Sequence, residues 1–185
     1  MLVNRARRYG GRVPDPPPVA RPSRATASAQ DGPALVSVTA LHLPGADRGE
    51  LREAAHRLVA EQAGRQVGGR AGGRVTRLCP RCGSVAHGRP HVRGAHLSLS
   101  YADGLVLVAV ATVPVGVDVE PGRPDWARAE AVLKCTGEGL RGEPDETGLH
   151  LQPLPGLDAW VAARGATVLR FSSAGRAAPA PGATG

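Results

Sequence analysis

Val115-Gly-Val-Asp-Val-Glu120 is the stretch of the chain whose pattern says most about its fold. Because side chains alternate faces along a strand, the three valines are predicted to enter a core, and Asp118 and Glu120 to share the opposite face. Two carboxylates at this spacing can converge on one hard cation with oxygen ligands, for which Mg²⁺ is the usual choice. The alternative interpretation is an edge strand with a solvated acidic face.

The residues before this stretch predict three more strands and a helix. Residues 96–100 and 105–112 are strand-like runs, and Asp103-Gly104 between them is a hairpin signal. Residues 34–43 partly alternate between apolar and polar side chains, which favours a strand. Apolar positions recur at helical spacing over residues 51–62, so a helix is expected there.

The residues after the stretch predict a second helix and two weaker strands. Residues 126–135 have helical spacing, and Trp126 and Leu133, at opposite ends of two turns, are expected on its buried side. Residues 149–154 and 167–172 are strand candidates. Strands that alternate with single helices and hairpins indicate an α+β fold.

The chain is strongly basic, but its composition makes that weak evidence for nucleic-acid binding. The formal net charge is +7, and Lys134 is the only lysine among 23 basic residues. Such an arginine bias, with 25 Gly and 17 Pro, is what a GC-rich coding bias produces. The longest apolar run, residues 105–111, is far shorter than the ~18 residues of a membrane span. We therefore expect neither a nucleic-acid nor a membrane partner.

The two ends of the chain differ in composition from its middle. Residues 1–33 are rich in Arg, Pro and Ser and lack an apolar period, so a disordered leader is expected. A disordered tail is expected over residues 177–185, which leaves a single domain over residues 34–176. The first residues lack the apolar core of a secretory signal, and the three cysteines are an odd number in a chain too long for a disulfide scaffold. A cytoplasmic location is therefore expected.

Two further pairs of polar residues could belong to a site. Glu130 and Lys134 lie four positions apart and therefore on one helix face, where they can bind a metal and a phosphate or form an ordinary surface ion pair. Ser98 and Ser100 share one strand face, where their hydroxyls can hydrogen-bond phosphate oxygens or simply continue a polar alternation. The residues alone leave both choices open.

Taken in order, the motifs of residues 50–142 resemble those of the 4′-phosphopantetheinyl transferase superfamily, in its broad-specificity branch of actinobacterial type. The motifs are Cys79-Pro-Arg-Cys-Gly, His87-Gly-Arg-Pro90, His96-Leu-Ser-Leu-Ser-Tyr101, Gly116-Val-Asp-Val-Glu120 and Trp126-Ala-Arg-Ala-Glu-Ala-Val-Leu-Lys134. The resemblance implies two pseudo-symmetric α/β halves, at about residues 34–112 and 113–176. It also implies a monomer that transfers the phosphopantetheine arm of coenzyme A, the co-substrate, to a serine of an apo acyl or peptidyl carrier protein and releases 3′,5′-ADP.

The resemblance also implies roles for individual residues. Asp118, Glu120 and Glu130 would hold Mg²⁺ against the coenzyme A pyrophosphate. Glu130 would also take the proton of the attacking serine, directly or through a metal-bound water. Lys134 would place its ammonium group near the pyrophosphate and act with Glu130 in catalysis.

Three more residues would contact coenzyme A on the same resemblance. Arg89 would meet its 3′-phosphate, and Ser100 would hydrogen-bond a phosphate or a nearby group. Tyr101 stands where the family has a histidine, and it keeps a hydrogen-bonding tip without the possible positive charge.

The chain departs from the family most clearly after Glu120. Only nine residues separate Glu120 from Glu130, fewer than this branch usually has, so the second half is expected to be incomplete and transfer to be impaired. Ala129 also replaces a lysine of the family motif. A non-catalytic paralogue that binds coenzyme A or a carrier protein is therefore an alternative.

A zinc knuckle is the remaining alternative. Cys79, Cys82, His87 and His91 have a spacing that could bind Zn²⁺, and with the arginine excess this would suggest a small nucleic-acid-binding protein. The loop has no aromatic residue, however, whereas proteins that bind single strands usually present stacking platforms. The transferase resemblance also accounts for Gly88-Arg89-Pro90 without zinc.

Overall fold

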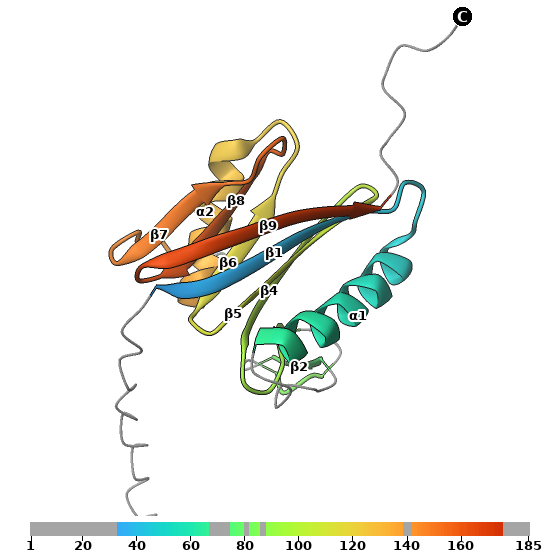
Figure 1. Cartoon of the computed structure of the whole chain (residues 1–185), viewed down its shortest axis with the longest axis horizontal. Coiled ribbons are helices and arrows are strands. Elements are labelled where there is room, and N and C mark those ends of the chain that lie inside the picture. Colours follow the sequence, from blue (N-terminus) through green and yellow to red (C-terminus); the bar gives the residue numbers. More distant parts are fainter. Residues whose placement is uncertain (1–32, 67–74, 80–81, 86–87, 139–141, 176–185) are drawn as a thin grey trace, which may run out of the picture. The chain divides into compact units, whose positions relative to one another are not determined.

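The computed structural model describes residues 33–66, 75–79, 82–85, 88–138 and 142–175, all in one compact unit (Figure 1). Except for residue 33, the expected leader and tail lie outside the described residues. The predicted α+β class is confirmed. The elements in chain order are β1 (Ala34–His42), α1 (Arg48–Gln66), β2 (Thr76–Leu78), β3 (Arg89–His91), β4 (His96–Ala102), β5 (Leu105–Ala111), β6 (Val115–Val119), α2 (Pro124–Thr136), β7 (Leu149–Pro153), β8 (Ala159–Arg164) and β9 (Thr167–Gly175).

The larger sheet has the strand order β4-β5-β1-β9. Its strands are antiparallel except for β9, which pairs in parallel with β1. The predicted hairpin at Asp103-Gly104 joins β4 to β5, and the positive φ of Gly104 (59°) permits the tight turn. Asp47 caps the start of α1 with a capping box. The N–H of Glu50 donates to Asp47 Oδ1, and the N–H of Asp47 donates to the Glu50 carboxylate.

A second sheet, with the order β6-β8-β7, repeats the topology of the first. In each case a strand is followed by a helix and later by a hairpin, and the last hairpin strand pairs antiparallel with the first strand. The sequence β1, α1, β4 and β5 thus corresponds to β6, α2, β7 and β8. After β8 the chain returns to the larger sheet as β9, so a division near residue 112 does not separate the two sheets completely. The strands β2 and β3 form a small sheet of their own.

Three apolar clusters order the described elements into layers (Figure 1). The largest cluster lies between the two sheets and includes Val38, Leu107 and Val117. The other face of β5, with Val108, packs against α1, and a third cluster joins α2 to β8. Because it is covered on both faces, β5 is buried along its whole length.

Gly116 lets α2 approach β6 more closely than any other residue would. A Cβ at this position would lie 1.9 Å from the carbonyl oxygen of Ala131 and 2.6 Å from the backbone nitrogen of Cys135. The glycine within residues 115–120 is therefore required for packing. It seats α2 on β6, two positions before Asp118 along the strand.

Three features differ from the expectations. The short paired strands β2 and β3 were not expected. The strand β8 was not expected, because Ala159-Trp-Val-Ala-Ala-Arg164 contains three alanines, which have low strand propensity, and it forms between two partner strands. The placement of Trp126 on the buried side was wrong: it lies in the first turn of α2 and is 46% exposed, whereas Leu133 is buried. Neither of the described helices has the length and apolar character needed to cross a membrane.

Candidate active site

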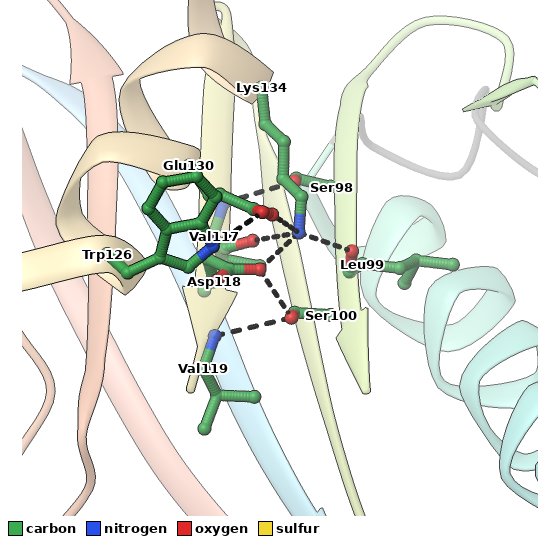
Figure 2. Close-up of polar contacts among 9 residues, drawn as sticks. All are labelled: Ser98, Leu99, Ser100, Val117, Asp118, Val119, Trp126, Glu130 and Lys134. Carbon is green, nitrogen blue, oxygen red and sulfur yellow. Dashed lines mark hydrogen bonds and ion pairs between the residues drawn. The ribbon is translucent and has the colours of Figure 1, made fainter. Parts of the chain in front are cut away.

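Two serines of β4 join the edges of the two sheets. The backbone N–H of Val117 donates to Ser98 Oγ at 3.0 Å, and the N–H of Val119 donates to Ser100 Oγ at 3.3 Å. The hydroxyls therefore accept bonds that a neighbouring backbone would accept inside a sheet. Figure 2 shows β4 and β6 side by side with these contacts between them. The predicted common face of the two serines thus lies at the junction of the sheets.

Asp118 is the buried acid of this junction. The residue is 2% exposed, and its Oδ1 accepts from Ser100 Oγ at 2.7 Å and from Lys134 Nζ. Its Oδ2 is buried and has no hydrogen-bond partner in the described part of the chain. A solvated acidic face is therefore the wrong interpretation for Asp118. A buried acceptor left unpaired costs on the order of 1–3 kcal/mol, more when it is charged, so Oδ2 is a ready ligand for a donor or a cation.

Lys134 reaches from α2 into the junction (Figure 2). Besides Asp118, its ammonium group donates to the carbonyl oxygen of Val117 at 3.2 Å and to that of Leu99 at 3.5 Å. The predicted pair with Glu130 is also present, with 3.9 Å between Nζ and Oε2. The ammonium therefore links β4, β6 and α2, and an ordinary surface ion pair is the wrong interpretation.

Glu130 is positioned by a contact that the sequence analysis missed. Its Oε1 accepts from the indole N–H of Trp126 at 2.9 Å, and its side chain is 17% exposed. The guanidinium of Arg123 lies 5.1 Å from the centre of the Trp126 ring. Trp126 and Glu130 are four positions apart, so this contact could have been found from helical spacing. The exposed tryptophan orients a carboxylate at the rim of the site.

The predicted magnesium ligands are only partly brought together. Asp118 and Glu130 both face the Lys134 ammonium, and oxygen donors suit Mg²⁺, so these two carboxylates and the unpaired Asp118 Oδ2 fit a cation. Glu120 lies one residue past the end of β6, and its backbone is fixed by a bond to the Asp158 carbonyl. In the described ranges no three His, Cys, Asp or Glu side chains are grouped as a metal site would need.

A basic cluster surrounds Tyr101 at the end of β4. The guanidinium of Arg48 lies 5.6 Å from its ring centre. Burial raises the pKa of Tyr101, although the charges of Arg77, Arg52 and Arg48 act in the opposite direction. Burial also lowers the pKa of His56, and Arg77 and Arg52 lower it further. These arginines could not be singled out from the sequence, because α1, β2 and β4 are separate in the chain and no local pattern relates them to Tyr101.

Arg89 lies in β3, but its side chain is outside the described part of the structure, so its predicted contact with a 3′-phosphate stays a prediction.

A groove of about 260 Å³ opens beside Lys134. Its lining is mostly apolar and includes Leu97, Leu99 and Leu133. There is therefore room for part of a ligand between β4 and the end of α2.

The cysteines of the predicted zinc knuckle lie in a tight turn. Gly83 N–H donates to the carbonyl oxygen of Cys79 at 2.8 Å, and Cys79 N–H donates to that of Ser84 at 2.9 Å. His87, the third predicted ligand, is outside the described residues, so the zinc site stays a prediction.

Neither models of known protein families nor curated proteins match this chain.

Proposed function

We propose that this chain is a Mg²⁺-dependent 4′-phosphopantetheinyl transferase with the two-halved fold of that superfamily. The observation that carries the proposal is the meeting of three separate motifs: Ser100 of β4, Asp118 of β6 and Lys134 of α2 are in direct contact, and Glu130 flanks them. The repeated strand–helix–hairpin topology supports the same proposal, because these contacting residues lie where the two sheets meet.

The proposed reaction transfers the phosphopantetheinyl group from coenzyme A to a serine hydroxyl. The hydroxyl oxygen of a carrier-protein serine attacks the β-phosphorus of coenzyme A, and the bond from that phosphorus to the bridging oxygen of the pyrophosphate breaks. The products are the phosphopantetheinyl serine and 3′,5′-ADP. Glu130 accepts the serine proton at its carboxylate, which Trp126 holds at the rim of the site.

The other residues of the site would stabilise the negative charge of the pyrophosphate. Lys134 places a positive charge against the pyrophosphate, and Ser100 can turn its hydroxyl from Asp118 to a phosphate oxygen. Mg²⁺ held by Asp118 and Glu130, with Glu120 as the ligand that the motif supplies, would neutralise charge on the phosphoryl oxygens. Asp118 Oδ2, which is buried and has no hydrogen-bond partner among the described residues, supports this assignment.

The basic cluster extends the proposal to the nucleotide end of coenzyme A. Arg48, Arg52 and Arg77 gather at Tyr101, directly after Ser100 in β4, and can bind the 3′-phosphate together with Arg89. The groove beside Lys134 can take part of the pantetheine arm. A cytoplasmic location belongs to the same proposal, because coenzyme A and apo carrier proteins occur there.

A non-catalytic paralogue is the second candidate, and two observations favour it. The Lys134 ammonium is held by acceptors of the protein itself, and Glu120 is not grouped with the other two carboxylates. Such a chain would bind coenzyme A at the same junction without transferring its arm.

One experiment separates the two candidates. The chain is incubated with Mg²⁺, coenzyme A and an apo carrier protein, the mass of the carrier protein is measured, and coenzyme A binding is titrated in parallel. We expect a gain of one phosphopantetheine, which Asp118→Asn and Glu130→Gln abolish and Glu61→Gln, on the exposed face of α1, leaves unchanged. Binding of coenzyme A without transfer supports the paralogue. If the chain neither binds coenzyme A nor transfers its arm, both candidates are refuted.

A further inference from the structure

The outer face of the larger sheet changes from apolar to polar between β5 and β1. On this face Val106, Val108 and Val110 of β5 pack under α1. The next two strands present Ser37 and Thr39 of β1, with Arg170 and Ser172 of β9 as their register partners. A groove of about 730 Å³ lies here, two strands away from β4 and the candidate active site.

A buried amide forms part of this groove. Gln62 of α1 lines it and is only 5% exposed, and its Nε2 donates to Thr39 Oγ1 at 2.6 Å. Its Oε1 is buried without a partner in the described part of the chain. Burying an amide with one end unpaired lowers the stability of the fold. A contribution to stability therefore does not explain why Gln62 stands at a buried position of α1.

The amide begins a short hydrogen-bond chain. Because Gln62 donates to Thr39, the Thr39 hydroxyl has its own hydrogen available for Ser172 Oγ, which lies 2.9 Å away. When Thr39 donates to it, Ser172 has its own hydrogen left to donate outward. Ser172 is exposed, so a donor polarised from the protein interior is presented on the face that lines the groove.

Positive charge accompanies this donor. Arg170 lies two positions before Ser172 and therefore on the same face of β9, and Arg65 of α1 also lines the groove. Among the described residues the lining contains no acidic side chain, and Glu61, which pairs with Arg65 at 3.8 Å, is outside it. Two guanidiniums and an outward hydroxyl donor are the groups that bind a phosphate or a carboxylate.

We propose that the groove between α1 and the outer face of β1 and β9 binds an oxyanion, the phosphate or carboxylate group of a small ligand. Arg170 and Ser172 contact the anion, Arg65 flanks it, and Gln62 leaves the Thr39 hydrogen free to be donated to Ser172. The site does not depend on the transferase activity, because it shares no residue with the junction of β4, β6 and α2.

The test uses inorganic phosphate and malonate as probes, titrated by calorimetry against the full chain in buffer whose ionic strength is matched with NaCl. We expect saturable binding of at least one probe and a melting temperature that rises by about 3 °C or more at ten times the dissociation constant. Preference for phosphate or for malonate distinguishes the two ligand sources. No saturable binding of either probe overturns the proposal.

Variants then locate the site. Arg170→Gln and Ser172→Ala should each weaken binding about tenfold or more, whereas Arg164→Gln and Ser173→Ala, their matched controls on β8 and β9, should not. Gln62→Glu is the sharpest variant, because a carboxylate can only accept from Thr39 and therefore turns the chain inward; binding should be lost while the protein stays folded. Equal losses in Arg170→Gln and Arg164→Gln, or unchanged binding in Gln62→Glu, would show that the groove is not the site.

Discussion

Replacing Lys134 by methionine tests whether the lysine neutralises the buried Asp118 or forms only an ordinary surface ion pair. In the wild-type chain its ammonium contacts Asp118, which is 2% exposed, and two backbone carbonyl oxygens. Removing one partner of a buried ion pair costs roughly 3–5 kcal/mol, because the other charge stays buried. Lys134 is itself 32% exposed, so screening by solvent reduces the expected loss to about 2–3 kcal/mol.

The size of this effect can be separated from lost packing with a double-mutant cycle. We expect Lys134→Met to lower the free energy of unfolding by about 2–3 kcal/mol, a fall in melting temperature of about 4–12 °C. Lys134→Met combined with Asp118→Asn should recover at least about 1 kcal/mol relative to Lys134→Met alone, because no charge is then left buried. Urea denaturation of the four chains of the cycle provides the measurement.

The matched control is Arg65→Met, which removes a cation from an exposed pair with Glu61 and should cost less than about 1 kcal/mol. If Lys134→Met costs no more than this control, or if the double variant is as unstable as the sum of the single ones, Asp118 does not depend on Lys134. The described junction would then be wrong in its central contact.

Three further perturbations have definite expected results. Gly116→Ala forces α2 away from β6, since its Cβ would lie 1.9 Å from a backbone oxygen; thermal denaturation should show a loss of about 1–3 kcal/mol, and an unchanged melting temperature would refute the close approach. Trp126→Phe removes the donor to Glu130 from an exposed side chain, so the initial rate of transfer should fall several-fold with a melting temperature within about 2 °C of wild type; an unchanged rate counts against positioning by the indole. Because the pKa of His56 in the folded chain is lowered from 6.5, the stability it contributes is present above pH 6.5 and is lost as pH falls through the folded pKa. His56→Gln should therefore flatten the dependence of the unfolding free energy on pH below 6.5, and an identical slope in both chains would contradict this.

Most of the elements could be predicted because their patterns are local. Alternation in β1 and β6, helical spacing in α1 and α2 and the Asp103-Gly104 turn are all set by neighbouring residues. The strand β8 could not be predicted in this way. Its alanines carry little strand preference, and its stability comes from partners on both sides.

The candidate site was predicted in its composition but not in its contacts. Spacing placed Glu130 and Lys134 on one face of α2, yet the main partner of Lys134 is Asp118, which another element supplies. Contacts of this kind depend on how the two sheets meet, and no local pattern encodes that. The burial of Asp118 follows from the same meeting, because Ser100 of β4 and α2 close over it.

The mass of an apo carrier protein, measured after incubation with this chain, Mg²⁺ and coenzyme A, is the decisive measurement for the proposed transfer. We expect the mass to rise by one phosphopantetheine in the presence of the wild-type chain and to stay unchanged with Asp118→Asn. An unchanged mass with the wild-type chain, under conditions in which another phosphopantetheinyl transferase modifies the same carrier protein, would contradict the proposal that this junction is an active site.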